Sequence, residues 1–379
     1  MKYYLIAGEP SGDLHGSNLI KGLLKADPDA HFRFWGGDLM AAAGGERNLA
    51  KHYRETSFFG IVQVLKNLRT IKRQMRECQA DVAAFAPDVL ILVDYPGFNM
   101  KMARWAREHG IRTFYYIAPK VWAWREHRVK SIRRWVDKLF IIFPFERTYF
   151  PRHGIEPVFE GNPLIDAIEA RRAALPPPDE FRRRHNLDHR PIIALLAGSR
   201  RGEIRDNLPL MAALSRKFPE RQFVVAGVAW LDRALYEQYT AGSGIRYVCD
   251  QTYETLAAAE AAVVTSGTAT LETALLGIPE VVVYRTVWWQ VWLRPYVLKV
   301  PWVSLVNLNL GREAVAEIIQ SDFSVDRAER ELRAILHGGS KRGKMLADFG
   351  ELKTIIGGPG ASERFAARMV AELHAQKIK

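Results

Sequence analysis

The sequence predicts an α/β protein built from two doubly wound domains, and three observations lead to this fold class. Continuous apolar runs such as residues 88–93 are typical of strands that a parallel sheet buries on both faces. Several of these runs end in a small polar turn that contains glycine and opens a helical pattern. The same succession of strand, turn and helix occurs in both halves of the 379-residue chain, a length that favours two domains.

The first half begins with a strand at residues 3–7 and a glycine-rich loop at 8–16, which opens a helix to about residue 24. Further strands are predicted at residues 32–35, 88–93, 111–117 and 139–143. The loop follows a strand's carboxyl end, where open α/β sheets bind ligands. Its glycines lack the G-x-G-x-x-G spacing of dinucleotide sites, which argues against a nicotinamide or flavin cofactor.

Asp94 follows the strand at 88–93 and precedes a stiff Pro96-Gly97 turn. A carboxylate at the carboxyl edge of a sheet is well placed to act as a general base. The alternative is that this residue caps the helix that begins near Asn99.

The second half follows a charged segment at residues 165–187, whose three consecutive prolines are typical of a domain boundary. Strands are predicted at residues 191–197, 223–226, 245–248, 261–264 and 281–284. A helix is expected at about residues 312–320, and further helices surround the break at 357–360.

Two glycine turns in this half, at residues 198–204 and 265–268, each open a helix whose free N–H groups favour anions. Arg200 or Arg201 can supply the positive charge that a diphosphate leaving group needs. Glu272, in the first turns of the later helix, can accept hydrogen bonds from sugar hydroxyls. These residues suit a nucleotide diphosphate, and an ordinary βαβ turn accounts for them about equally well.

The composition limits the chemical classes of partner that the protein is expected to bind. The net charge of +12 favours anionic partners, namely nucleic acid, anionic lipid or phosphorylated substrates. The basic residues form no recognised nucleic-acid module. Cys78 and Cys249 lie far apart in the chain, which excludes a disulfide framework and fits a reducing cytoplasm. No apolar run approaches the length of a membrane span.

Two segments carry apolar faces beside basic residues. In the helix predicted at residues 57–75, one face carries Ile61, Val64, Leu65, Leu68 and Ile71. Residues 286–303 are rich in aromatic side chains, including Trp288, Trp289 and Trp292. Either segment can pack into a core or rest on an anionic membrane surface, and the sequence pattern leaves both interpretations open.

Taken together, the motifs of this chain resemble those of the lipid-A-disaccharide synthases. The segments that carry the resemblance occur in order along nearly the whole chain: Gly8-Glu-Pro-Ser-Gly-Asp-Leu-His-Gly16, Asp94-Tyr-Pro-Gly-Phe-Asn99, Tyr116-Ile-Ala-Pro-Lys-Val-Trp-Ala-Trp124, Gly161-Asn-Pro163, Gly198-Ser-Arg200 and Thr265-Ser-Gly-Thr-Ala-Thr-Leu-Glu272. This family of bacterial glycosyltransferases has the GT-B architecture, in which two Rossmann-like doubly wound domains face a cleft.

The resemblance implies a domain plan. Residues 1–165 would form an acceptor and membrane-facing domain, and residues 186–339 a domain that binds the UDP-sugar donor, with a linker at 166–185. The C-terminal helices at about 340–379 would pack back on the first domain or be exchanged in a homodimer.

The resemblance also implies a reaction. The enzyme would transfer 2,3-diacylglucosamine from its UDP conjugate to 2,3-diacylglucosamine 1-phosphate (lipid X), with inversion and without metal or cofactor. The products would be the lipid A disaccharide 1-phosphate and UDP. The enzyme would act peripherally on the cytoplasmic face of the inner membrane, held there by anionic phospholipid, with no nucleic-acid partner.

Residue roles follow from the matching positions. Asp94 resembles the base that deprotonates the acceptor 6-hydroxyl, and Arg200 would stabilise the departing diphosphate. The donor site would comprise Gly8, Glu9, Ser11, Gly12, Ser199, Ser266, Gly267, Thr268, Ala269, Glu272, Asn307 and Gln320. This chain departs from the family at Val306, where the family usually has proline, and at Gln63, where it has a carboxylate.

Three other functions fit parts of the pattern. A UDP-sugar epimerase or a peptidoglycan-type glycosyltransferase shares the architecture, but an epimerase of soluble substrates needs no exposed apolar face. A membrane-associated binding protein without catalytic activity would not need Asp94. Nucleic-acid binding would rest on the basic surface alone.

Overall fold

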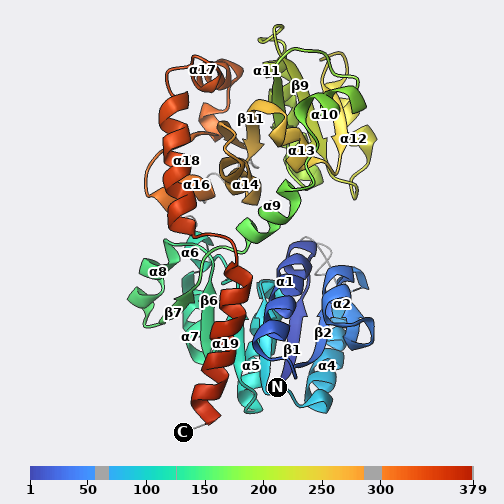
Figure 1. Ribbon diagram of the computed structural model, residues 1–379, viewed down its shortest axis with the longest axis vertical. Coiled ribbons are helices and arrows are strands. Elements are labelled where there is room, and N and C mark those ends of the chain that lie inside the picture. Colours follow the sequence, from blue (N-terminus) through green and yellow to red (C-terminus); the bar gives the residue numbers. More distant parts are fainter. Residues whose placement is uncertain (56–67, 125, 286–300, 378–379) are drawn as a thin grey trace. The chain divides into compact units, whose positions relative to one another are not determined.

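Two groups of parallel strands, one in each of two units of the chain, form the framework of the fold (Figure 1). The computed structural model describes residues 1–55, 68–124, 126–285 and 301–377. The first unit comprises Met1–Asp166 and Gly357–Lys379, and the second comprises Ala167–Ile356. The segment 166–185, expected to be a linker, is largely helical and lies almost wholly in the second unit. Residues 340–356, expected with the first domain, also lie in the second unit.

The described strands of the first unit form one sheet, and all of its pairings are parallel. Its spatial order is β3 (Leu49–His52), β2 (His31–Gly36), β1 (Lys2–Ala7), β4 (Val89–Val93), β5 (Thr113–Tyr116), β6 (Lys138–Ile141) and β7 (Pro157–Phe159). The chain builds outward from β1 in one direction and from β4 in the other. The boundary between β1 and β4 is therefore the topological switch point, where ligands bind in open α/β sheets.

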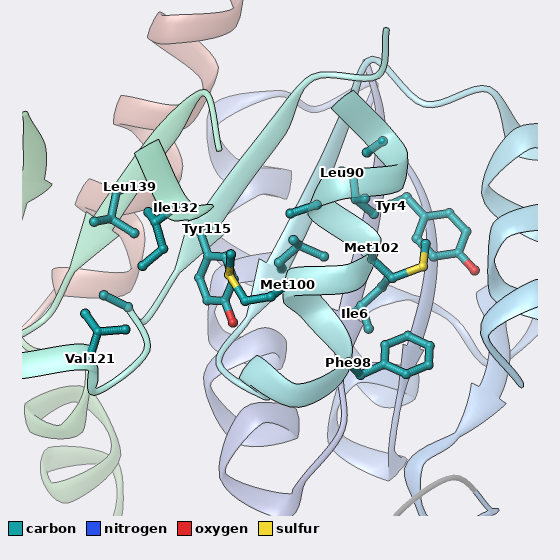
Figure 2. Packing of buried hydrophobic residues seen from close by; sticks show 14 of the residues in the cluster. Tyr4, Ile6, Leu90, Phe98, Met100, Met102, Tyr115, Val121, Ile132 and Leu139 are labelled. Atoms are coloured by element: carbon teal, nitrogen blue, oxygen red, sulfur yellow. The ribbon is translucent and has the colours of Figure 1, made fainter. Parts of the chain in front are cut away.

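Helices cover both faces of this sheet. They are α1 (Pro10–Ala26), α2 (Asp38–Gly44), α4 (Leu68–Phe85), α5 (Pro96–Glu108), α6 (Val121–Trp124), α7 (Val129–Trp135), α8 (Glu146–Tyr149) and α19 (Ala361–Lys377). Residues Tyr4, Leu90 and Tyr115 point to one face and pack against α5 and α7 in the apolar cluster of Figure 2. On the other face, α19 runs beside α1, and its Phe365 contacts the rings of Tyr116 and Phe140. The C-terminal helix thus completes the first unit.

The second unit repeats the plan with a parallel sheet. Its described strands lie in the order β10 (Arg246–Cys249), β9 (Gln222–Gly227), β8 (Ile192–Leu196), β11 (Ala259–Thr265), β12 (Glu280–Tyr284) and β13 (Ala316–Ile319). The switch point lies between β8 and β11. The helices are α9 (Leu164–Arg172), which begins in the first unit, α10 (Pro178–Arg184), α11 (Arg201–Ser215), α12 (Arg233–Thr240), α13 (Thr252–Ala257), α14 (Thr268–Leu276), α16 (Leu305–Leu310), α17 (Val325–Ile335) and α18 (Arg342–Ile356).

The prediction of a helix at residues 312–320 is wrong. Helix α16 occupies residues 305–310 instead, and Gly311 ends it with a left-handed φ of 67°. The following residues form strand β13, which pairs in parallel with β12. The periodicity of a short run such as Ala316–Ile319 does not distinguish a helix from a strand. Here the run forms a strand because it can pair with the edge of β12.

The helix predicted at 57–75 lies partly outside the described residues. The described part, α4, continues to Phe85, and its Cys78 and Val82 are fully buried against the sheet, while Met75 is partly buried. The apolar face of this later part of the helix is therefore core. Arg69, Lys72, Arg73 and Arg76 are exposed on α4 and form a basic outer surface.

Candidate active site

The first site lies at the β1–β4 switch point, where the loop after β1 packs against the turn after β4. Gly8 lies directly against the ring of Tyr95, where a Cβ atom would collide with it. At Gly12, a Cβ atom would approach that of Ala7 to 3.3 Å, so this residue allows α1 to approach β1. Glu9 is the N-terminal residue that precedes α1, and Ser11 is exposed in its first turn. The sheet order thus brings these predicted donor residues beside Asp94.

Asp94 occupies a strained turn. Asp94 and Tyr95 have φ values of 45° and 47°, a left-handed conformation that non-glycine residues rarely adopt. The backbone oxygen of Asp94 accepts hydrogen bonds from the Tyr115 hydroxyl at 2.6 Å and from the Asn99 amide at 2.8 Å. Such strain persists only where surrounding contacts enforce it, and it concentrates at functional sites. Burial raises the pKa of the Asp94 carboxyl, although the charge of Lys120 and the N–H of Tyr95 oppose this shift.

Asp13 and His15 of the same motif have different roles in the structure. The Asp13 carboxylate accepts hydrogen bonds from the N–H groups of Gly37 and Met40, at 2.7 and 3.0 Å, and so caps helix α2. The Nδ1 atom of His15 is buried and makes no hydrogen bond to the described residues. Burial lowers the pKa of His15 to about 4, so the ring is neutral at physiological pH.

Glu146 is a buried acid that the sequence analysis did not identify. It begins α8 beyond β6 and accepts hydrogen bonds from the Trp122 indole at 3.0 Å and from the N–H of Phe143 at 3.1 Å. Burial raises its pKa from 4.5 to about 7. The pairing joins residues 24 positions apart, and no local pattern indicates it.

The raised pKa of Glu146 predicts a pH-dependent stability. Because the folded-state pKa lies above the unfolded value, this carboxyl stabilises the fold below pH 4.5 and loses that contribution as the pH rises to about 7. We expect the free energy of unfolding of the wild type to fall, relative to Glu146→Gln, by up to about 1.4 kcal/mol per pH unit. Urea denaturation of both proteins from about pH 5 to about pH 8 measures this difference. A difference that stays constant across the interval would contradict the assignment.

The second site lies at the β8–β11 switch point of the other unit. After β8, Gly198 has a φ of 108°, and the Glu203 side chain fills the space beside it. Glu203 accepts a hydrogen bond from the Ser199 N–H at 2.9 Å and forms an ion pair with Arg200 at 2.8 Å. The Arg200 side chain is 73% exposed, so it can leave this ion pair for a bound anion at little cost.

The neighbouring turn after β11 opens helix α14. The Ser266 N–H donates to Val283, but those of Gly267, Thr268 and Ala269 make no hydrogen bond to the described residues. Three free donors at the start of a nine-residue helix attract an anion, because the helix dipole adds to their partial charges. This geometry supports the predicted diphosphate site.

Glu272 lies one turn further along α14. Its carboxylate accepts a hydrogen bond from the Tyr253 hydroxyl at 2.6 Å, and the Arg171 guanidinium stacks on the Tyr253 ring at 5.3 Å. Burial raises the pKa of Glu272, and the Tyr253 hydrogen bond and the Arg171 charge oppose this rise. Tyr253 orients Glu272 from helix α13, a contact that the sequence pattern did not indicate.

Asn307 does not fit the predicted donor-binding role. Its side chain is fully buried, and its amide donates to Val315 and Glu317 while accepting from the N–H groups of Ala314 and Val315. No hydrogen-bonding position of this amide is left for a ligand, so we assign it a structural role. Gln320 lies at the carboxyl end of β13 with a left-handed φ of 53°, and it remains a candidate site residue.

The predicted membrane-facing residues lie mostly outside the described residues. These are Ile61, Val64, Leu65, Trp288, Trp289 and Trp292, and the side chain of Leu68 is also outside. Ile71 lies on α4 and is half-buried. Within the described part of the chain, no helix is long and apolar enough to cross a bilayer. In the same part, no three His, Cys, Asp or Glu side chains gather closely enough to hold a metal ion.

Comparison with known proteins decides the family. The family described as Lipid-A-disaccharide synthetase matches residues 3–355. The chain is 36% identical over 370 residues to the lipid-A-disaccharide synthase of Syntrophus aciditrophicus, covering 96% of this chain and 95% of that protein. It is 38% identical over 379 residues to the synthase of Myxococcus xanthus, covering 97% and 96% of the two chains.

The chain belongs to the lipid-A-disaccharide synthase family. This membership confirms the resemblance inferred from the motifs and favours it over the epimerase and binding-protein interpretations.

Solved structures confirm the GT-B fold of this family member. The UDP-GlcNAc 2-epimerase of Neisseria meningitidis, bound to UDP-GlcNAc, superposes with a TM-score of 0.71 at 12% identity, covering 98% of this chain and all of that one. The calicheamicin glycosyltransferase CalG4 superposes with a TM-score of 0.59 at 12% identity, covering 100% and 99% of the two chains. At such low identity the likeness concerns the fold alone.

Proposed function

We propose that this protein transfers 2,3-diacylglucosamine from its UDP conjugate to the 6-hydroxyl of 2,3-diacylglucosamine 1-phosphate. The products are a β-1,6-linked disaccharide 1-phosphate and UDP. The proposal rests on the two switch points: the half-buried Asp94 carboxylate lies at that of the first sheet, and N–H donors without a partner among the described residues lie with an arginine at that of the second. Membership of the lipid-A-disaccharide synthase family supports the same reaction.

The second unit binds the UDP end of the donor. The N–H groups of Gly267, Thr268 and Ala269 hold the diphosphate, and Glu272 accepts hydrogen bonds from ribose hydroxyls. Arg200 leaves Glu203 to neutralise the charge that develops on the departing UDP. Ser199, Ser266 and Gln320 complete this site in the second unit. The family motif implies that Gly8, Glu9, Ser11 and Gly12 of the first unit also contact a substrate.

Asp94 activates the acceptor. Its carboxylate takes the proton of the acceptor 6-hydroxyl as the oxygen attacks the anomeric carbon of the donor. The bond between that carbon and the diphosphate breaks on the opposite face, and the electron pair leaves with UDP. Attack and departure on opposite faces invert the anomeric configuration.

Incubation of the enzyme with UDP-2,3-diacylglucosamine and the monosaccharide 1-phosphate tests the proposal. Mass spectrometry is expected to show the disaccharide 1-phosphate and an equal amount of UDP, with neither formed when one substrate is omitted. Conversion of UDP-N-acetylglucosamine to an epimer, with no disaccharide, would show instead that the fold serves epimerase chemistry.

We also propose that the enzyme works peripherally on the cytoplasmic face of the inner membrane, because both substrates carry acyl chains. The exposed basic residues of α4 support this location, since Arg69, Lys72, Arg73 and Arg76 would meet anionic headgroups.

Replacing Val64, Leu65 and Leu68 with serine tests the apolar part of this surface. We expect weaker binding to anionic liposomes in a flotation assay, because these side chains would enter the lipid interface. The melting temperature is expected to change little. Unchanged flotation with a clear loss of thermal stability would show that the three side chains are core residues.

A further inference from the structure

A single exposed lysine lies in an otherwise buried stretch beside the proposed base. From Thr113 through Trp122, every residue except Lys120 is buried. No carboxylate of the described residues forms an ion pair with Lys120. An exposed cation without a partner is ordinary on a helix surface, but this one follows a sheet strand at the ligand-binding edge.

The turn that carries Lys120 is held on both sides. Before it, Ile117 has a left-handed φ of 65°, rare for a β-branched residue, and its N–H donates to Phe140 at 3.0 Å. After it, Val121 belongs to the apolar cluster of Figure 2, and the Trp122 indole donates to the buried Glu146. A strained residue and two buried anchors thus fix the backbone from which the lysine projects.

The position of Lys120 relative to Asp94 follows from the sheet. Strands β4 and β5 are adjacent and parallel, with Val93 opposite Tyr116, and the Asp94 N–H donates to Tyr116 at 3.0 Å. The turns after these two strands therefore lie on the same edge. The Lys120 charge opposes the burial that raises the pKa of the Asp94 and Glu146 carboxyls, which agrees with this common edge.

We propose that Lys120 binds the 1-phosphate of the acceptor sugar and so selects the phosphorylated monosaccharide. This inference rests on the proposed function. The phosphate and the reacting 6-hydroxyl belong to one sugar ring, so an acceptor whose hydroxyl meets Asp94 carries its phosphate into the neighbourhood of that residue. A lysine ammonium is a suitable point charge for a phosphate monoester.

The anionic groups of the two substrates would then bind to different residues. The diphosphate of the donor meets Arg200 and the N–H groups of α14 in the second unit, whereas the monoester of the acceptor meets Lys120 in the first. The other role open to Lys120 is to tune the Asp94 carboxyl, which would affect every acceptor equally.

Comparison of two acceptors separates these roles: the 1-phosphate and the same diacylglucosamine without phosphate. The wild type is expected to prefer the phosphorylated acceptor in kcat/KM by about 10- to 100-fold, the usual range for a charge-assisted hydrogen bond. Lys120→Ala should lose most of this preference through a higher KM for the phosphorylated acceptor alone. Lys120→Arg should retain much of it, and Lys101→Ala, which removes an exposed lysine from α5, should behave like the wild type.

A Lys120→Ala enzyme that keeps the wild-type preference overturns the proposal. An equal loss with both acceptors also overturns it, because the lysine would then act on Asp94 or on the turn. Formation of no disaccharide by the wild type from either acceptor would contradict the proposed function itself, and the assignment of Lys120 would fall with it.

Discussion

Replacement of Asp94 with asparagine is expected to lower kcat for disaccharide formation by about 10²- to 10⁴-fold, the usual contribution of a general base. Asparagine keeps the shape of the side chain and tolerates the left-handed backbone at this position better than other residues do. The fold and the KM for the donor are therefore expected to stay close to the wild-type values. Steady-state kinetics with saturating acceptor measures the loss, and Asp29→Asn, at an exposed turn, serves as the control.

The pH dependence of the reaction rate gives a second test of Asp94 as the base. Because burial raises the pKa of Asp94, the wild-type rate should fall on the acid side at a higher pH than an ordinary aspartate would give. The residual rate of the asparagine variant should lack this acid limb. A variant that retains full turnover, or that shows the same acid limb, would exclude Asp94 as the base.

The second large effect is expected at Arg200. Arg200→Ala should lower kcat by about 10²- to 10³-fold, because the charge that develops on UDP would lose its mobile counterion. Stability should change little, since an exposed ion pair such as Arg200–Glu203 contributes about 0–1 kcal/mol. Rate measurements and urea denaturation of the same preparation separate the two effects.

Arg201 provides the matched control. It is the next residue, it is exposed, and it carries the same charge at the start of α11. Arg201→Ala should keep near wild-type turnover if Arg200 alone meets the diphosphate. A larger loss of turnover at Arg201 than at Arg200 would show that Arg201, and not Arg200, meets the diphosphate.

Much of the fold could be predicted from the sequence because continuous apolar runs and glycine turns are local signals. The runs that became β1, β4, β8 and β11 were each followed by the turn that now carries site residues. The switch points follow from the order of these strands, and the order itself needed the structure. This explains why Asp94 and the Gly8 loop could be named separately as candidates while their contact through Tyr95 could not.

The features that sequence reasoning missed depend on contacts between distant residues. Strand β13 is a four-residue run that becomes a strand because β12 offers an edge. The role of Asn307 is decided by Glu317 and by the backbone that follows α16. Residues 357–379 rejoin the first unit, as the family resemblance implied for the C-terminal helices, but the point at which the chain returns, after Ile356, needed the structure.

A crystal structure of the protein with UDP bound would show whether the second unit holds the donor nucleotide while the first supplies the base. We expect the diphosphate to lie against the N–H groups of Gly267, Thr268 and Ala269, with Arg200 turned from Glu203 toward it. A diphosphate bound instead to the Gly8–Gly12 loop beside Asp94 would show that the first unit holds the donor nucleotide.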